Sequence, residues 1–233
     1  MVIIKYKNVI SGVFLNRPNR FIANVEVDGK TETVHVKNTG RCKELLINGA
    51  TVYLSVSDNP LRKTKYDLIA VEKVTESGTI LINMDSQIPN DVAEEWLKSG
   101  KLFSCNAIIK RECKYKNSRF DFYIEDGSAK AFLEVKGVTL ENGGVASFPD
   151  APTERGIKHI NELCECLKDG YNAYILFVIQ MKGVALFTPN YKTHKAFGDA
   201  LKEAYDKGVN ILVYDSIVTK DGIMLDSPID YKL

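Results

Sequence analysis

The sequence predicts an α+β protein in two parts, a small β-barrel over residues 1–84 and a mixed sheet flanked by helices over residues 85–233. Two observations lead to this fold class. Up to Met84, short strand patterns follow one another with little helical periodicity, and beyond the polar stretch DSQIPN strand and helix patterns alternate. A chain of 233 residues with 45% hydrophobic residues can bury the cores of two small domains without disulfide bonds.

Five or six strands are expected in the first part, and the Asp28-Gly29 pair marks a hairpin turn between two of them. Many short strands with few helices favour a closed barrel, and an oligonucleotide-binding (OB) fold is the barrel that best fits this pattern. The expected strands are residues 2–6, 21–27, 31–37, 51–57, 66–74 and 79–83.

The first part is basic, although the whole chain carries a net charge of only +1. Residues 1–66 contain eleven Lys or Arg against five Asp or Glu, and the remaining residues contain twenty against twenty-five. A phosphate-binding module joined to a metal-binding module would show this asymmetry, and ordinary surface charge would show it too.

Basic and polar residues of the first part cluster in three loops. Some lie beside aromatic residues, which suits a groove that follows a nucleic-acid backbone and stacks bases; charges that only keep the loops soluble are the simpler explanation. Among the aromatics, Phe21 is expected in the barrel core. The loop around Gly40, where backbone amides can approach a phosphate, also contains Thr39 and Lys43. The expected nucleic-acid-binding residues are Arg17, Arg20, Lys37, Asn38, Arg41, Arg62, Lys63 and Lys65.

The second part is expected to begin with a helix over residues 91–99, capped by Asn90 and ended by Gly100. Its apolar residues form one stripe, and Glu94 and Glu95 lie away from that stripe. A solvent-facing position is therefore expected for both.

Residues 118–137 predict two strands joined by a turn at Asp126-Gly127, because apolar and polar residues alternate on either side of the turn. If the loop comprises four residues from Asp126, Asp121 lies directly opposite Glu134. A two-residue loop would shift the pairing by two and keep both carboxylates on one face. Lys136 projects from that face in either register.

Two carboxylates that face each other across a hairpin repel, and a divalent cation would compensate them. An oxygen-rich site with few protein ligands suits Mg²⁺ or Mn²⁺, which also bind phosphate oxygens. Asp121 and Glu134 are therefore the expected metal ligands, and Glu112, on an expected strand over residues 106–115, is a further candidate ligand. Lys136 would orient the attacking water. A solvated hairpin face with a surface ion pair is the simpler explanation.

Arg155 and His159 lie one turn apart on a flanking face of an expected helix over residues 154–168. That face could present Arg155 to a scissile phosphate and His159 to a water or phosphate oxygen. The alternative for His159 is a surface pair with Glu162.

The remaining elements complete a mixed sheet. Asp150 or Thr153 is expected to cap the helix over residues 154–168, and Gln180, at the end of an apolar central strand, could border the site. The tail from Asp221 is expected to be irregular. The expected elements are strands 138–140, 145–148, 171–181, 184–188 and 209–214 and a helix over 193–207.

Five cysteines without a C-x-x-C pair, and three histidines, do not form a zinc site, and reduced thiols in a cytosol are the expected state. Lys5 and Lys7 interrupt the apolar start of the chain, so no signal peptide is expected. The longest apolar run, residues 173–179, is too short to span a bilayer. The sequence therefore predicts a cytoplasmic protein without a membrane partner.

The segments SRFDFYIEDG, LEVKGVTL and ASFPDAPTERGIKHINEL resemble the sugar fermentation stimulation protein A family, and RPNRF and HVKNTGRCKEL extend the resemblance over nearly the whole chain. The resemblance implies a DNA-binding protein with an OB-type barrel and a C-terminal half like the PD-(D/E)xK nucleases. Asp121, Glu134 and Lys136 match that nuclease motif, although Phe120 replaces its proline. The resemblance also supports site roles for Glu154, Arg155 and His159. It further implies that a helical acid, Glu94 or Glu95, could join the site.

Two functions remain open. One is a metal-dependent phosphodiester hydrolase, an Mg²⁺-dependent DNA endonuclease in which Asp121, Glu134, Lys136, Arg155 and His159 act together. The other is a non-catalytic DNA-binding regulator of sugar metabolism genes. A sugar-metabolism enzyme is a weaker third reading, because no phosphate loop or sugar-binding signature is present. The sequence leaves the oligomeric state open, a homodimer included.

Overall fold

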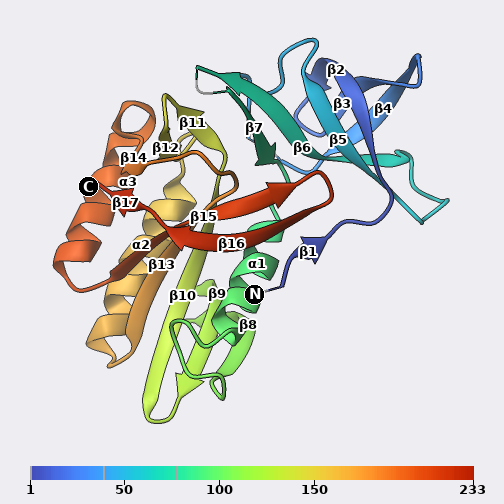
Figure 1. The fold of residues 1–233 in the computed structure, drawn as a ribbon. Helices are drawn as coiled ribbons and strands as arrows, with labels where there is room; N and C mark the ends of the chain where they lie inside the picture. Colours follow the sequence, from blue (N-terminus) through green and yellow to red (C-terminus); the bar gives the residue numbers. More distant parts are fainter. Residues whose placement is uncertain (1, 39, 77) are drawn as a thin grey trace.

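The structure is a computed structural model that describes residues 2–38, 40–76 and 78–233. Three sheets and three helices occur in those residues, and Figure 1 shows a barrel beside a mixed sheet that carries helices on both faces. The predicted α+β class and the order of barrel and mixed sheet are confirmed. Thr39, part of the expected basic loop, lies outside the described residues.

The barrel consists of strands in the order β4-β3-β2-β5-β6-β7, and it closes where β4 pairs in parallel with β6 at His35 and Asp67. Side chains such as Phe14, Val25 and Val34 point inward and form its core. The strands are β2 (Val9–Asn19), β3 (Ile22–Val27), β4 (Lys30–Val36), β5 (Thr51–Val56), β6 (Tyr66–Thr75) and β7 (Gly78–Asn83).

The two ends of the chain differ from the prediction. The expected first barrel strand, β1 (Ile4–Lys5), pairs instead with β16 (Gly222–Pro228), an outer strand of the mixed sheet. The tail, expected to be irregular, contains β16 and β17 (Asp230–Tyr231). An alternating pattern shows which side chains face a core but not which strand lies next to them, so long-range pairings of this kind escape prediction.

The mixed sheet has the order β1-β16-β15-β13-β10-β9-β8, with β10, β13 and β15 parallel to one another. Helix α1 packs on one face with Leu133 and Val135, while α2 and α3 pack on the other with Phe132 and Phe177. The further elements are β8 (Ile108–Tyr115), β9 (Ser118–Asp126), β10 (Ala129–Val138), β13 (Asn172–Ile179), β15 (Asn210–Thr219), α1 (Ile88–Lys98), α2 (Glu154–Lys168) and α3 (Tyr191–Asp206).

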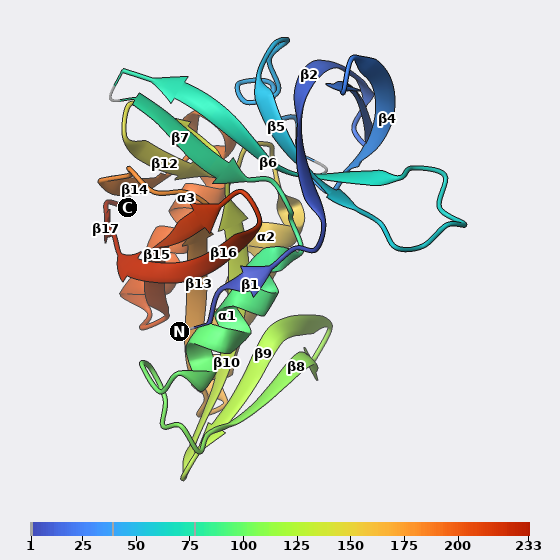
Figure 2. The same ribbon diagram turned by 45° about the vertical axis from the view of Figure 1, so that its right-hand side comes forward.

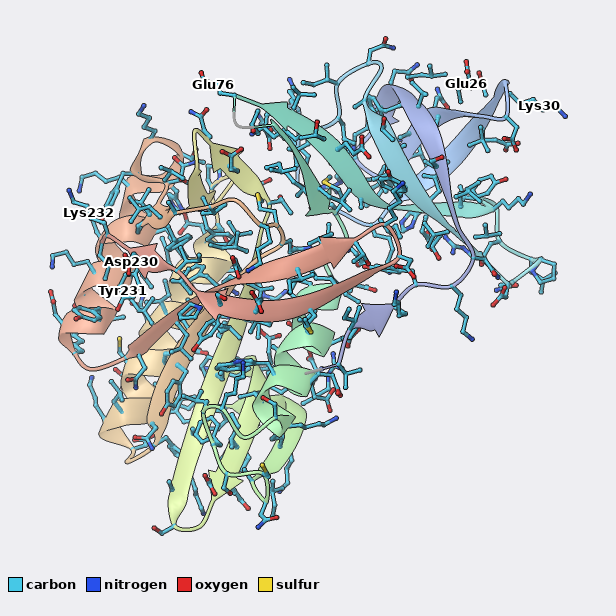
Figure 3. The ribbon with its side chains drawn as sticks, viewed as in Figure 1. Glu26, Lys30, Glu76, Asp230, Tyr231 and Lys232 are labelled. Carbon is cyan, nitrogen blue, oxygen red and sulfur yellow. The ribbon has the colours of Figure 1, made fainter. Side chains whose placement is uncertain are left out.

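A third, small sheet lies between the mixed sheet and the barrel. It has the order β11-β12-β14-β17, and Nζ of Lys73 in β6 contacts the Glu141 carboxylate of β11 at 2.5 Å. Figure 2 shows the barrel lying across one end of the mixed sheet. In Figure 3, Glu26 and Lys30 mark the β3–β4 turn on the side of the barrel far from that sheet. The new strands are β11 (Leu140–Asn142), β12 (Val145–Phe148) and β14 (Leu186–Pro189).

The helix caps differ in part from the expected ones. Helix α1 begins at Ile88, with Gln87 in the capping position and no side-chain cap, so Asn90 lies inside the helix rather than before it. Thr153, one of two expected caps of α2, accepts a hydrogen bond from the Gly156 amide at 3.0 Å. No helix among the described residues is long and apolar enough to cross a membrane.

Candidate functional site

The β9–β10 hairpin has the register expected for the longer loop, although Asp126 itself pairs with Ala129 and leaves only residues 127 and 128 in the loop. Glu125 pairs with Lys130, and the regular pairing continues as far as Phe122 and Leu133. The next step of this register places Asp121 opposite Glu134. There the strands separate.

The Asp121 carboxylate occupies the point of separation. Its Oδ2 accepts a hydrogen bond from the Val135 amide at 2.7 Å, a bond that a backbone carbonyl would otherwise take, and its Oδ1 accepts one from Asn90 of α1 at 2.9 Å. The sequence did not indicate Asn90 as a site residue. Its position just before an apolar stripe is typical of a helix cap, and it was therefore expected to have that role.

The alternation of β9 also changes at Asp121. Phe120 packs against Phe132 and His159, with ring centroids 5.3 and 6.1 Å apart, and so belongs to the α2 face. Phe122 packs with α1. The strict alternation expected for these two phenylalanines is therefore wrong, and the irregularity brings Asp121 to the edge between the two faces.

Glu134 lies on the α2 face with only 3% of its surface exposed. Its Oε1 contacts both Lys136 Nζ and His159 Nδ1, while its Oε2 is buried and has no hydrogen-bond partner within the described residues. Burial raises the pKa of Glu134, but the hydrogen bond from His159 and the charge of Lys136 outweigh it and hold that pKa below its ordinary value. Glu134 therefore remains ionised.

Asp121 titrates at higher pH than Glu134. Burial, and next the negative charge of Glu134, raise the pKa of Asp121 to about 6, against the hydrogen bond from Val135 and the charge of Lys136. Two neighbouring carboxyls with separated pKa values are typical of functional sites. The structure thus brings Asp121, Glu134 and Lys136 together, and the Asp121 carboxylate with Glu134 Oε2 are the atoms that could hold a divalent cation.

His159 is 5% exposed and positions Glu134 instead of lying at the surface. Its Nε2 accepts a hydrogen bond from Arg155 Nε at 3.4 Å, so the ring proton resides on Nδ1 and is donated to Glu134. Among the described residues, Glu162 pairs with Lys158 at 3.9 Å and not with His159.

The other candidate acids point elsewhere. Glu112 has a positive φ of 55° and a side chain that is 55% exposed and lies 3.8 Å from Arg119. The structure does not bring it to the pair, since no three His, Cys, Asp or Glu side chains in the described ranges are placed to share a metal ion. Glu94 and Glu95 contact Lys98, and Glu154 pairs with His194.

The site lies at the end of the sheet that meets the barrel. Gln180 follows β13 and donates a hydrogen bond to the Val138 carbonyl of β10, and its side-chain amide donates to the Asn83 and Asp85 carbonyls at the exit of the barrel. Ligands of open α/β sheets bind at this end of parallel strands. Gln180 therefore joins the sheet to the barrel, and its expected place at the border of the site stays a prediction.

Four of the eight expected nucleic-acid-binding residues have side chains that form hydrogen bonds or ion pairs with other residues of the protein. Arg17 donates to four backbone carbonyls at 2.6–2.8 Å, Lys37 contacts the buried Asp85, and Arg62 forms a fork with Asp67 at 2.6 and 2.8 Å. These groups stabilise loops and cannot also bind a phosphate without giving up those bonds. The four residues are Arg17, Lys37, Asn38 and Arg62.

The other four are exposed. Lys65 Nζ lies 5.0 Å from the centre of the Tyr66 ring, and the Arg20 guanidinium lies 4.8 Å from that of Phe21. Phe21 is 48% exposed, so its expected place in the barrel core is wrong, whereas Tyr66 is buried. The exposed basic residues of the expected set are Arg20, Arg41, Lys63 and Lys65.

A cavity of about 400 Å³ opens beside Asn19 and Arg20, the two residues that precede Phe21. Its wall is basic and comes mostly from the β2–β3 turn and the loop after β4, and Ala151, four residues before Arg155, completes it. The lining residues are Arg17, Asn19, Arg20, Gly40, Arg41, Lys43, Leu46 and Ala151.

Fold and site together define a class of α+β protein in which an OB-type barrel precedes a mixed-sheet domain with an acid, acid and lysine cluster at the junction. The chain belongs to the sugar fermentation stimulation protein family. The model of the SfsA N-terminal OB domain matches residues 15–82, and that of the sugar fermentation stimulation protein RE domain matches residues 87–222.

Relatives match along the whole chain. Sugar fermentation stimulation protein homologs of Ruminiclostridium cellulolyticum and Clostridium beijerinckii are each 58% identical, over 98% and 97% of this chain and 100% and 98% of theirs. The solved structure of SfsA from Pyrococcus furiosus in complex with Ca²⁺ is 28% identical, with a TM-score of 0.85 over 100% of both chains.

Proposed function

We propose that this protein is a metal-dependent phosphodiester hydrolase that acts on DNA. The observation that carries the proposal is the buried Oε2 of Glu134, which has no partner among the described residues and belongs to a carboxylate that neighbours Asp121. A buried anionic oxygen left without a donor is costly, and a bound cation would satisfy it.

Asp121 and Glu134 would hold Mg²⁺ or Mn²⁺, ions that accept a few carboxylate ligands and complete their shells with water and phosphate oxygens. When bound, such an ion supplies positive charge to a phosphate and acidifies water. The relative from Pyrococcus furiosus was solved in complex with Ca²⁺, another hard cation that prefers oxygen ligands, which supports the proposal of a cation site in this chain.

The other residues prepare the reaction. Lys136, two residues from Glu134 on the same face, would donate a hydrogen bond to the attacking water and so orient it. Arg155 uses Nε on His159, and its remaining N–H groups, which have no hydrogen-bond partner among the residues that the structure describes, could donate to a phosphate as negative charge develops there. His159 contacts Glu134 and acts through it, so it is a positioning residue.

Cleavage assays with Mg²⁺ or Mn²⁺ on single-stranded, duplex and branched DNA test the proposal, with Asp121→Asn, Lys136→Met and the matched control Glu112→Gln. We expect cutting by the wild type and by the control, and none by the other two. If all four proteins bind DNA and none cuts, the protein is a DNA-binding regulator and the hydrolase proposal is wrong.

A further inference from the structure

Phe21 is an aromatic side chain held outward at the turn between β2 and β3. Asn19 Oδ1 accepts hydrogen bonds from the amides of Phe21 and Ile22 at 2.9 and 3.2 Å and fixes this turn. The Arg20 guanidinium lies over the ring at 4.8 Å. An exposed ring on a fixed turn, with a stacked arginine, offers a flat surface to a nucleobase.

The basic cavity lined by Asn19 and Arg20, next to Phe21 in the same turn, is suited to hold an anion. Arg17 joins its two loops through the carbonyls of the β2–β3 turn and the loop after β4, and so fixes the shape of the wall. The Arg41 and Lys43 side chains, both exposed, have no hydrogen bond or ion pair with any described residue. They can therefore donate to a phosphate at no cost in lost contacts.

Two acids lie near this wall. The Asp150 carboxylate approaches Gly40 so closely that a side chain at that position would collide with it, and both Asp150 and Glu44 raise the pKa of the buried Cys42. The wall carries four cationic side chains, those of Arg17, Arg20, Arg41 and Lys43, against these two acids, so its charge remains positive.

The cavity lies next to the start of α2. Ala151 forms part of its wall, and Gly40 contacts Asp150 in the same segment. Arg155 follows Ala151 by four residues, which a fully extended chain would separate by at most about 14 Å. A strand bound in the cavity therefore lies close to the first turn of α2, which carries Arg155.

We infer that Phe21 and this cavity form a binding site for single-stranded DNA, with a base on the Phe21 ring and an adjacent phosphate in the cavity. In a duplex the bases are paired and stacked on each other, so an aromatic ring beside a phosphate site finds no free base face. Binding of single-stranded DNA does not depend on the proposed function. Only the further step, that the hydrolase cuts a substrate with an unpaired strand, rests on it.

Fluorescence anisotropy in EDTA, where cleavage does not occur, measures binding apart from catalysis. The probes are a labelled single-stranded oligodeoxynucleotide, a duplex of the same sequence and the corresponding RNA strand. The variants are Phe21→Ala, Phe21→Trp and, as a matched exposed apolar control on another face of the barrel, Val74→Ala. Thermal unfolding confirms that each variant is folded.

We expect Phe21→Ala to weaken binding of the single strand about 5- to 100-fold, the range that one lost base stack produces, and to change duplex binding less than twofold. Phe21→Trp and Val74→Ala should bind as the wild type does. Unchanged single-strand affinity in Phe21→Ala, or an equal loss for both DNA forms, overturns the inference, and tighter binding of RNA than of DNA overturns the assignment to DNA.

The cleavage assay separates this inference from the proposed function. If the wild type prefers single strands through Phe21 but cuts no DNA with either metal, the binding site stands and the hydrolase does not. If it cuts duplex and tailed DNA equally and Phe21→Ala cuts both as well as the wild type, the hydrolase stands and the single-strand site does not.

Discussion

His159 holds Glu134 by one oxygen of its carboxylate and leaves the other oxygen buried without a partner in the described part of the chain. The helix and the strand that carry these residues thus fix the direction in which the free oxygen points. Preorganised ligands of this kind bind a cation with little rearrangement.

Replacing Glu134 by Gln should abolish cation binding. The amide keeps the shape of the side chain but loses the charge, and its nitrogen cannot ligate a metal. Calorimetric titration with Mn²⁺ measures the effect, and Glu112→Gln is the control because that acid lies outside the site. Retained Mn²⁺ affinity in Glu134→Gln would place the cation elsewhere.

Cation affinity should fall as the pH drops through about 6, because Asp121 has its pKa raised to about 6 and cannot ligate when protonated. Glu134, whose pKa is lowered, remains ionised over this range. Titrations of the wild type with Mn²⁺ between pH 5 and pH 8 check the prediction. An affinity that does not change over this range would show that Asp121 is not a ligand.

Asp121→Asn should stabilise the metal-free protein at pH 8 by on the order of 1–3 kcal/mol. The folded protein binds the Asp121 proton more tightly than the unfolded chain, so the wild type loses stability as the pH rises from the ordinary carboxyl pKa to about 6. The advantage of the variant should therefore be complete above this window and smaller at pH 5. Urea unfolding in EDTA at both pH values measures it, and equal values would contradict the prediction.

His159→Ala should lower Mn²⁺ affinity about 10- to 100-fold, the usual effect of removing a residue that orients a ligand. His159→Asn should restore most of this affinity, because its amide nitrogen can take the place of Nδ1 and donate to Glu134. Calorimetry on both variants gives the comparison. A purely structural role would leave both variants equally impaired.

Arg41→Gln should weaken DNA binding and lower the slope of log affinity against log salt concentration by about 1. Arg62→Gln should leave the slope nearly unchanged, because that guanidinium is already occupied by Asp67. Anisotropy at several salt concentrations distinguishes them. A larger slope change for Arg62 than for Arg41 would move the DNA surface to the β5–β6 loop.

Local sequence patterns predicted the hairpin well. Alternation and the Asp126-Gly127 turn left two registers, one of which places Asp121 opposite Glu134. The spacing of Lys136 placed it on the same face as Glu134 in both, because strand geometry depends on near neighbours. They did not predict the change of face at Phe120 and Phe122, which follows from the separation of β9 and β10.

Features that depend on packing between distant segments escaped prediction. The helical spacing of His159 fits a surface position as well as the buried contact with Glu134, and only the packing of α2 on β10 decides between them. Strand β2 was missed, since Gly12 and Pro18 weaken its pattern. Phe21 was assigned to the core because aromatic residues usually lie there.

The pairing of β1 with β16 gives the molecule a second link between its halves. The chain starts in the mixed sheet, crosses to the barrel after Tyr6, whose amide donates to Asp221 at 2.8 Å, and returns through residues 84–87. Two chain connections restrict rotation of the barrel relative to the mixed sheet more than one connection would. If the barrel binds DNA as we propose, this second link would keep the bound DNA in a fixed orientation toward the carboxylates.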